Sequence, residues 1–417
     1  MVVRLIMAPW LLLFGSMLLW KETRAAEPGP APYNLNTIIA LALERSPVIT
    51  GAKASIEQSR GQRMTAGAYP NPSVTGSAGR GSIRDPSTGV SITERTVTVE
   101  QPLEWPAKRE ARQRAADAGV AGATAGLEEA KLNLIAEIKV AFYQLLLAQR
   151  DADLSAQNLA MVKEVSRTAT ARVAAGDATK FDLMKATVEV QKATKDAARA
   201  QSAVLTARVA LNTKTAGALG HAFAVEGDFE PLKQEIRLEA LTERTLEDHP
   251  TLRRLSRLVD QADQTLIYEK ESRMPTVSVQ GQYHREAGDE SVTGGLSLPI
   301  PLWYRRQGEI QTALAGKHRL QAERDRMQNE LIQALTQHAQ EVRTAKGQID
   351  LFEQGLLKQA EETLRIARIS FQQGAASLLE VLDAQRVHRQ TLLEYAQVRM
   401  DLSVALARLE RASGGML

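Results

Sequence analysis

The sequence contains no cysteine among its 417 residues. That absence excludes a disulfide framework, a thiolate metal site and a catalytic thiol. It also excludes attachment of a lipid at a cysteine side chain. It does not by itself identify the compartment in which the protein works.

Aromatic residues and an excess of one charge are also scarce. Phe, Trp and Tyr make up 4% of the chain, which is low for a protein that builds several compact globular cores. Lys and Arg total 52 and Asp and Glu total 49, so the formal net charge is only +3. Nucleic-acid binding goes with a large positive excess, and we therefore expect no nucleic-acid partner.

The one long apolar run lies at the N-terminus. Arg4 is followed by apolar residues from Leu5 to Trp20, then by polar residues and by the small residue Ala25. This order is typical of a secretory signal peptide, and we predict that residues 1–25 are removed by cleavage after Ala25. The alternative is a membrane anchor, but an apolar core of about 16 residues is shorter than the roughly 20 that span a bilayer. No later segment is apolar enough for a transmembrane helix, so we expect an exported protein that is either soluble or a β-barrel.

The rest of the chain contains two copies of one unit. Four landmarks recur in the same order at a spacing of about 200 positions, which indicates an internal repeat. They pair Pro47 with Pro250, Pro72 with Pro275, Pro102 with Pro299, and Gly176 with Gly374. We predict a first repeat over residues 26–215, a linker or equatorial segment over 216–237, and a second repeat over 238–417.

Each copy is predicted to fold as helix, strand, strand, long helix and helix. The first helices, over 35–68 and 238–273, are rich in residues that favour helix and end at prolines. Alternation of polar and apolar residues predicts two short strands in each copy, joined by segments rich in turn residues. The strands lie at 73–78 and 96–100 in the first copy and at 276–280 and 295–298 in the second.

The long helices set the size of the molecule. Neither 106–173 nor 303–371 contains an internal proline, and each would extend roughly 100 Å as one helix. Each is followed by a reversal at a glycine, Gly176 or Gly374, and by a return helix that ends near Thr215 or Arg411. Helices this long do not fit an ordinary globular domain. The alternative that remains is a soluble coiled-coil filament.

The strands favour a membrane protein over a filament. One chain supplies four strands, and a closed membrane barrel needs at least about eight, which two or three chains would provide. Aromatic residues gather where strands pass into helices, as in the aromatic belt of a membrane interface. They are Tyr69, Trp105, Trp303 and Tyr304, with Tyr268 nearby. The alternative is that they pack at the strand–helix junctions.

Three segments carry a resemblance to a known family. They are QPLEWPAKR at 101–109, LPIPLWYRRQG at 298–308 and GAASLLEVLDAQR at 374–386. Together with the duplicated unit they resemble the TolC-like outer-membrane efflux proteins, over about residues 35–414. The two junction segments are most similar to the branch that serves cobalt–zinc–cadmium and copper–silver pumps of the resistance-nodulation-division type. Many relatives carry a lipidated cysteine after the signal, which this chain lacks.

The resemblance implies a fold and a set of partners. The fold is α plus membrane β-barrel: a long α-helical hairpin barrel continuous with an outer-membrane β-barrel of four strands per chain and twelve in a trimer. The implied assembly is a homotrimer in the lipid of the cell outer membrane, with a long periplasmic extension. Its partners are a periplasmic adaptor (membrane fusion) protein and an inner-membrane resistance-nodulation-division pump. The implied function is a passive exit duct for divalent heavy-metal cations.

The sequence gives no sign of an enzyme or of a cofactor. Nucleotide-binding, zinc-protease and serine-hydrolase motifs are all missing. The six histidines are scattered along the chain, so we expect no resident metal site. Two other functions stay open: an outer-membrane channel for drugs or organic solutes, and a periplasmic coiled-coil adaptor without a pore.

Two helix reversals are the expected adaptor-docking tips. Their residues are Ala175, Gly176, Asp177, Gln373, Gly374 and Ala375. The glycines suit a left-handed helix C-cap, and the resemblance implies that these tips meet the adaptor's own hairpin tips.

Three acids near the tips form the expected gate. Glu380 and Asp383 match the two acids that line the closed periplasmic entrance of TolC, although Ala376 replaces an arginine of that protein. The first copy offers Asp182 and Lys185 instead. Capping boxes, which pair a hydroxyl residue with an acid three positions later, would explain Glu380 and Asp182 but not Asp383. Asp383 lies on about the same helix face as Glu380, and three-fold symmetry would give six carboxylates around the opening.

Overall fold

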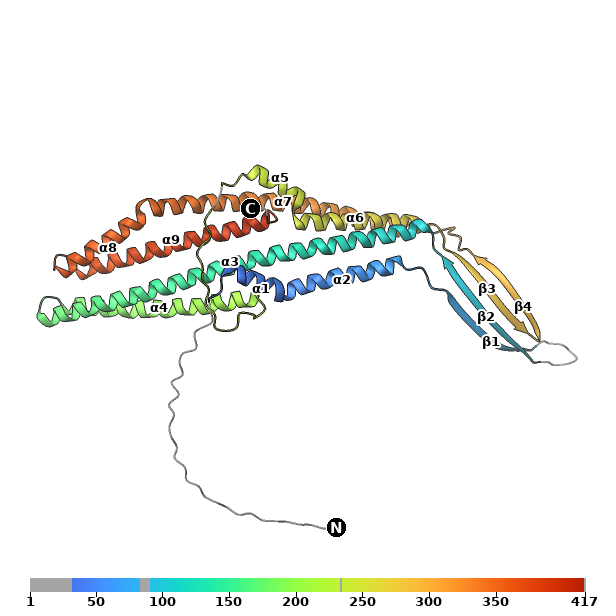
Figure 1. The fold of residues 1–417 in the computed structure, drawn as a ribbon, viewed down its shortest axis with the longest axis horizontal. Coiled ribbons are helices and arrows are strands. Elements are labelled where there is room, and N and C mark those ends of the chain that lie inside the picture. The colour runs from blue at the N-terminus through green and yellow to red at the C-terminus, as the bar shows by residue number, and fades with distance from the viewer. Residues whose placement is uncertain (1–31, 83–90, 233–234, 416–417) are drawn as a thin grey trace, which may run out of the picture.

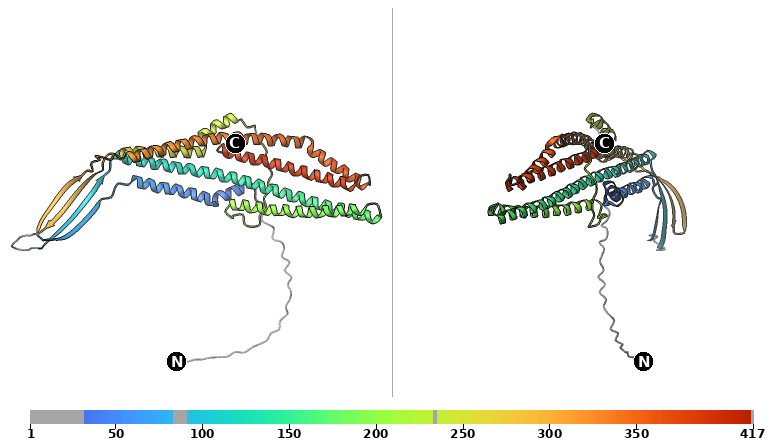
Figure 2. Two further views of the ribbon diagram at one scale, coloured as in Figure 1. Left: turned by 180° about the vertical axis from the view of Figure 1, so that it is seen from behind. Right: turned by 60° about the vertical axis from the view of Figure 1, so that its left-hand side comes forward.

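The protein is elongated, with helices along most of its length and a sheet at one end (Figure 1). The computed structural model describes residues 32–82, 91–232 and 235–415. The predicted signal peptide, residues 1–25, lies outside these ranges. Both helix reversals lie at the end of the molecule opposite the sheet (Figures 1 and 2).

The same order of elements occurs twice along the chain. The first half comprises α1 (Leu35–Arg45), α2 (Pro47–Gly67), β1 (Ser73–Ser82), β2 (Ser91–Leu103), α3 (Pro106–Ala175) and α4 (Lys180–Lys214). The second half comprises α5 (Leu238–Asp248), α6 (Pro250–Glu271), β3 (Val277–Glu286), β4 (Asp289–Ser297), α7 (Gln307–Leu351), a π-helical segment (Phe352–Leu356), α8 (Leu357–Gln372) and α9 (Leu378–Ala412). The boundaries proposed for the two repeats stay a prediction.

The helices predicted over 35–68 and 238–273 are each broken in two, so that prediction was wrong. The breaks fall at Ser46 and His249, whose ψ angles of 129° and 128° are extended rather than helical. Each precedes a proline, which disfavours helical geometry in the residue before it and starts the next helix well.

The first long helix is continuous, as predicted, and α3 has 70 residues. The second differs from the prediction at both its start and its middle. It begins at Gln307 rather than at Trp303, after Arg306 in a left-handed conformation with φ of 60°. It is then interrupted by the π-helical turn Phe352–Leu356, which holds the non-helical Gly355. Such a turn accommodates one extra residue and bends a helix.

Four strands within the described residues form one antiparallel sheet in the order β1-β2-β3-β4. The strands are longer than the alternating stretches in the sequence. Residues 284–291, predicted as part of a link, instead carry the β3–β4 ladder up to the pair Glu286 and Asp289. Only Ala287 and Gly288 form the turn, with φ angles of 54° and 101°. Positive φ at both central residues suits the twist of a two-residue hairpin.

The main core lies midway along the helices. Phe142, Tyr143 and Leu145 of α3 are fully buried there, together with side chains from α1, α4 and α9. The segment between α4 and α5 packs on the same core through Phe223 and Phe229. Within the ranges described above, no helix is both long and apolar enough to cross a membrane.

The break between α5 and α6 is capped by a histidine. His249 is 3% exposed, and its Nδ1 accepts a hydrogen bond from the Thr251 amide at 3.2 Å. Its Nε2 donates to the Arg411 carbonyl at the end of α9, 3.1 Å away. One neutral imidazole therefore caps α6 and ties it to the C-terminal end of α9. In the first half the buried Ser46 caps α2 with its hydroxyl.

This cap predicts acid-sensitive stability. Burial lowers the pKa of His249 below its ordinary value of 6.5, against the opposing effects of the Arg411 carbonyl and Glu129. Below pH 6.5 the unfolded chain therefore binds a proton more readily than the folded chain does. The stabilisation by the cap is present above pH 6.5 and is lost as the pH falls below it. His249→Asn keeps a capping acceptor without a titrating ring. We expect its Tm to fall less than that of the wild type between about pH 8 and about pH 5.

Ser46→Ala is the matched control, because it removes a cap that does not titrate. It should lower Tm by a similar amount at every pH. An equal acid-dependent fall in His249→Asn and the wild type would contradict the role of the ring.

Candidate functional site

The two helix reversals form the end of the molecule far from the sheet. The chain turns after α3 at Gly176 and after α8 at Gly374, with φ angles of 87° and 78°. The amides of Asp177 and Ala375 donate back to carbonyls of the preceding helices at 2.8 Å. A residue with a Cβ is strained in this left-handed conformation, which explains both glycines. The residues predicted as docking tips, 175–177 and 373–375, therefore lie at the outermost turns.

The two tips pack against each other within one chain. Ala169 and Ala186 of the first hairpin and Phe371, Leu378 and Val381 of the second form a small buried cluster. A contact that the sequence analysis missed adds to it: the Arg172 guanidinium lies over the Phe371 ring, 5.0 Å from its centre. Arg172 also lies so near Gly374 that a Cβ there would be 3.2 Å from its Nη2. The residues concerned are about 200 positions apart, so no local pattern in the sequence reveals this contact.

Two of the three predicted gate acids are helix caps. The Asp182 carboxylate accepts hydrogen bonds from the Thr179 hydroxyl at 2.7 Å and amide at 3.2 Å. These bonds, led by the hydroxyl, lower the pKa of Asp182. The Glu380 carboxylate accepts the Ser377 amide at 2.7 Å in the same way. Both capping boxes are complete.

Asp383 has no part in a cap. It lies one turn beyond Glu380 on α9, and its carboxylate forms an exposed ion pair with Arg386 at 2.5 Å. Exposed pairs three residues apart on a helix contribute little to stability. The three acids lie near the tips, and each carboxylate is bonded to a residue three positions away in the sequence.

The predicted belt residues surround the strand–helix junctions. Tyr69, Trp105, Trp303 and Tyr304 are all exposed, Trp303 by 90%. Two cations of α3 reach aromatic rings there: Arg109 lies 4.1 Å from the centre of the Tyr69 ring and Lys108 lies 5.7 Å from that of Tyr268.

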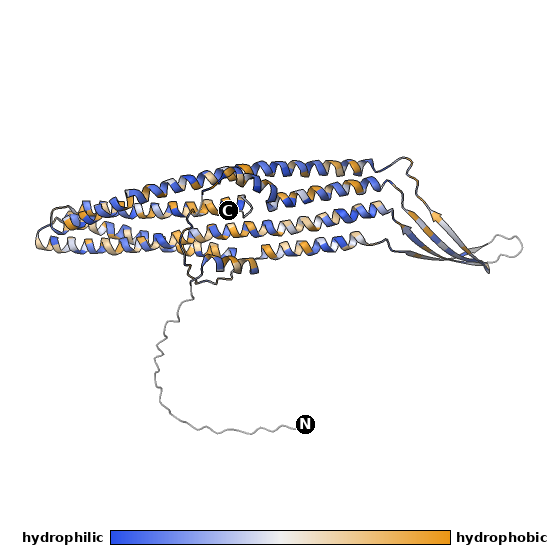
Figure 3. Cartoon of the chain, turned by 45° about the horizontal axis from the view of Figure 1, so that its top comes forward, coloured by the Kyte–Doolittle hydropathy of each residue, from blue (hydrophilic) through white to orange (hydrophobic). Residues whose placement is uncertain are grey.

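The sheet has one apolar and one polar face. Val97 of β2 pairs with Tyr283 of β3, which pairs with Val292 of β4. The neighbouring row on the other face consists of Thr96, His284 and Ser291. The apolar side chains are exposed, and Val292 and Leu296 are 81% and 74% accessible. Figure 3 shows the alternation along the strands.

The sheet is open at both sides. Within the described residues, β1 and β4 are its edge strands and pair only inward. An unpaired edge next to an apolar face is a template for strand pairing with another chain.

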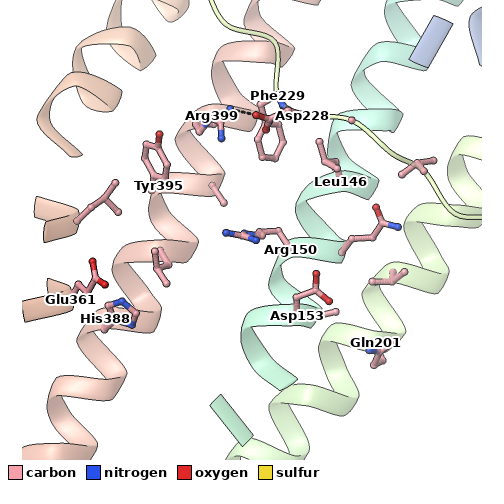
Figure 4. Close-up of a pocket in the computed structure, with 18 residues that line it drawn as sticks. Leu146, Arg150, Asp153, Gln201, Asp228, Phe229, Glu361, His388, Tyr395 and Arg399 are labelled. Atoms are coloured by element: carbon pink, nitrogen blue, oxygen red, sulfur yellow. Dashed lines mark hydrogen bonds and ion pairs between the residues drawn. The ribbon is translucent and has the colours of Figure 1, made fainter. Parts of the chain in front are cut away.

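A cavity of about 810 Å³ lies between the two hairpins and the segment that joins α4 to α5 (Figure 4). Arg150 and Asp153 of α3 and Glu361 and His388 of the second hairpin line it. At its rim Arg399 donates to Asp228 at 2.8 Å. Across the part of the chain that the structure describes, no three His, Asp or Glu side chains could hold a metal ion together.

Comparison with known proteins gives a consistent result. A family model described as outer membrane efflux protein matches residues 38–217 and 241–415. The chain is 26% identical over 385 residues to the cobalt-zinc-cadmium resistance protein CzcC of Cupriavidus metallidurans, across 92% of this chain and 90% of that protein.

Two solved structures share the fold. A membrane protein from Pseudomonas aeruginosa has a TM-score of 0.80 at 19% identity, over 91% of this chain and 90% of its own. The CmeC outer membrane channel of Campylobacter jejuni has a TM-score of 0.76 at 18% identity, over 91% of this chain and 85% of its own.

Proposed function

This chain belongs to the outer membrane efflux protein family, and from that membership we propose that three copies form the exit channel of a tripartite pump for divalent heavy-metal cations. The family consists of outer-membrane efflux channels, so the chain is an outer-membrane efflux channel protein and not an enzyme. The fold expected for one chain, long helical hairpins continuous with a four-stranded sheet, is confirmed. The alternative of a periplasmic adaptor without a pore is wrong for a chain that matches this family on both halves.

The observation that carries the proposal is the sheet with an exposed apolar face and two open edges. A bilayer covers apolar side chains but leaves unpaired backbone groups unsatisfied, so only a closed sheet is stable there. Four antiparallel strands place β4 of one copy antiparallel to β1 of the next, which allows identical copies to close. Three copies give twelve strands around a lumen lined by the polar face.

A second unpartnered surface supports assembly. On α4, the buried Ala186, Ala193 and Ala200 pack toward the rest of the chain at heptad spacing. The opposite side of the same helix exposes large apolar side chains: Phe181, Met184, Val188, Leu205 and Val209. These also fall at heptad spacing, and in the proposed trimer they pack on a neighbouring copy.

The cargo is proposed from the relative. CzcC is by its name a cobalt-zinc-cadmium resistance protein, and the junction segments resemble the same branch. A passive duct needs no tight metal site, because cargo that is held firmly does not leave. Efflux of drugs or organic solutes through the same architecture is the second candidate.

The channel and its cargo are tested together. We expect purified protein to be trimeric by mass in detergent and to conduct ions in planar bilayers. Deletion of the gene should sensitise its host to zinc, cobalt, cadmium or copper, and the wild-type gene should restore resistance. Leu205→Glu with Val209→Glu should weaken the trimer by placing charge in the proposed seam.

Leu205→Met with Val209→Ile is the matched control, since it keeps the seam apolar and should keep the trimer. A stable, non-conducting monomer would overturn the channel assembly. A deletion strain altered only in antibiotic tolerance would overturn the metal assignment.

The tips are proposed as the adaptor contact. Ala175, Asp177, Gln373 and Ala375 are therefore positions where a bulky side chain should abolish efflux and leave trimers intact. Ala203→Trp on α4 is a control, because Ala203 is exposed but far from the tips along the helix. Wild-type resistance in Ala175→Trp, Asp177→Trp, Gln373→Trp and Ala375→Trp would remove docking from these turns.

The acids near the tips are proposed as a cation-selective ring. Three-fold symmetry would place six carboxylates from Glu380 and Asp383 around the entrance, with Asp182 beside them. Asp383→Asn should reduce cation selectivity and block by multivalent cations, and should leave Tm nearly unchanged because Asp383 is exposed. Glu380→Gln keeps a side chain that can complete a capping box. Unchanged reversal potentials in both variants would leave Glu380 with its capping role alone.

A further inference from the structure

The segment between β4 and α7 exposes an unusual amount of apolar surface. Its residues 298–304 read LPIPLWY and include no charged side chain. Its five large apolar or aromatic side chains are all more than half exposed: Leu298, Ile300, Leu302, Trp303 and Tyr304. A contiguous exposed patch of this kind marks a binding surface rather than a random exposure.

The patch continues the apolar face of the sheet. In β4 that face carries Val292 and Leu296, which are four residues apart and so lie on the same side of the strand. The same parity continues past the end of the strand through Leu298, Ile300 and Leu302. The intervening positions are Pro299 and Pro301. Large apolar side chains therefore continue at every second position beyond Ser297, where the hydrogen-bonded ladder ends.

The backbone of this segment is suited to an apolar medium. Pro299 and Pro301 have no N–H group, and the Leu302 amide donates to the Ile300 carbonyl at 3.0 Å. The Arg305 side chain donates to the Pro301 carbonyl at 3.4 Å. In hydrocarbon each unsatisfied backbone group costs several kcal/mol, and these features lower that cost.

The matching junction of the first half, around Pro102, is shorter and contains a charged residue. There β2 extends to Leu103 and α3 begins at Pro106. The intervening Glu104 is held in an ion pair with Arg112 at 2.5 Å. Among the described residues, the second half thus has the longer junction and the one without a charged side chain.

Strand pairing with a second copy does not account for the patch. In the proposed trimer the strand beside β4 is the next copy's β1, which begins at Ser73 after Pro70 and Pro72. Prolines therefore flank this seam on both chains at the end nearest the helices. Since proline donates no hydrogen bond, the ladder between copies ends near Ser73 and Ser297, and residues 298–304 lie beyond it.

We propose that residues 298–304 are a lipid anchor, inserted into the outer membrane at the level where the sheet meets the helices. The inference rests on the proposed function, because it requires the sheet to lie in the bilayer. Leu298, Ile300 and Leu302 contact acyl chains. Trp303 and Tyr304 lie at the interface with water, which both ring types favour. The exposed Arg305 faces the lipid phosphates, whereas Arg306 is held by Glu269 at 3.0 Å.

The absence of cysteine from the chain allows a direct test. Single cysteines replace Ile300, Val292 and Ala375 in the full-length protein, and each carries a polarity-sensitive fluorophore. The protein is reconstituted into phosphatidylethanolamine–phosphatidylglycerol vesicles whose acyl chains are brominated or plain. Quenching by the brominated lipid reports contact with lipid, and quenching by aqueous iodide reports contact with water.

The label at Ile300 should be quenched by brominated lipid several-fold more than the label at Ala375, and should be protected from iodide. Iodide quenching at Ile300, or protection there from both quenchers, would overturn the anchor; the second result would mean that protein covers the segment. The label at Val292, on the apolar face of the sheet, separates this failure from that of the proposed function. If Val292 is quenched by lipid and Ile300 is not, only the anchor fails; if Val292 is not, the membrane channel fails as well.

Discussion

The structure depends on a sheet that a single chain cannot complete. Its hydrogen bonds run from β1 to β4 and stop at both edges, and its apolar side chains point out of the protein rather than into a core. In the proposed trimer, lipid buries that face and further copies pair those edges. The helices meet the opposite requirement. Their buried seams are narrow and rich in alanine, so each chain forms a thin wall rather than a globule.

The two halves share an order of elements but differ in the details that matter for function. The first half holds an uninterrupted helix of 70 residues, whereas the second contains the π-helical turn at Phe352–Leu356. The helix break is capped by Ser46 in one half and by the titratable His249 in the other. The two halves thus share a framework of elements, whereas the titratable cap and the uncharged exposed segment belong to the second half.

The tips have an observed structural role and a proposed functional one. The glycines and capping boxes explain how each hairpin reverses, and they explain Gly176, Gly374, Asp182 and Glu380 without any partner. Asp383 is different, because its exposed pair with Arg386 has little structural value. Among the acids near the tips, Asp383 thus has the smallest structural role and is the best candidate for a functional one.

The sequence by itself determined the features that arise from contacts between near neighbours. The reversals at Gly176 and Gly374, the two capping boxes and the unbroken α3 all follow from interactions within about one helical turn. The prolines that split the first helices, Pro47 and Pro250, are local signals too, and reading them only as landmarks of the repeat missed the breaks at Ser46 and His249. The tertiary structure alone decided which distant residues meet. It placed Arg172 on Phe371 and His249 on Arg411, and it aligned the strands so that their apolar residues share one exposed face. These contacts depend on how long helices lie against one another, and no short window of sequence contains both partners.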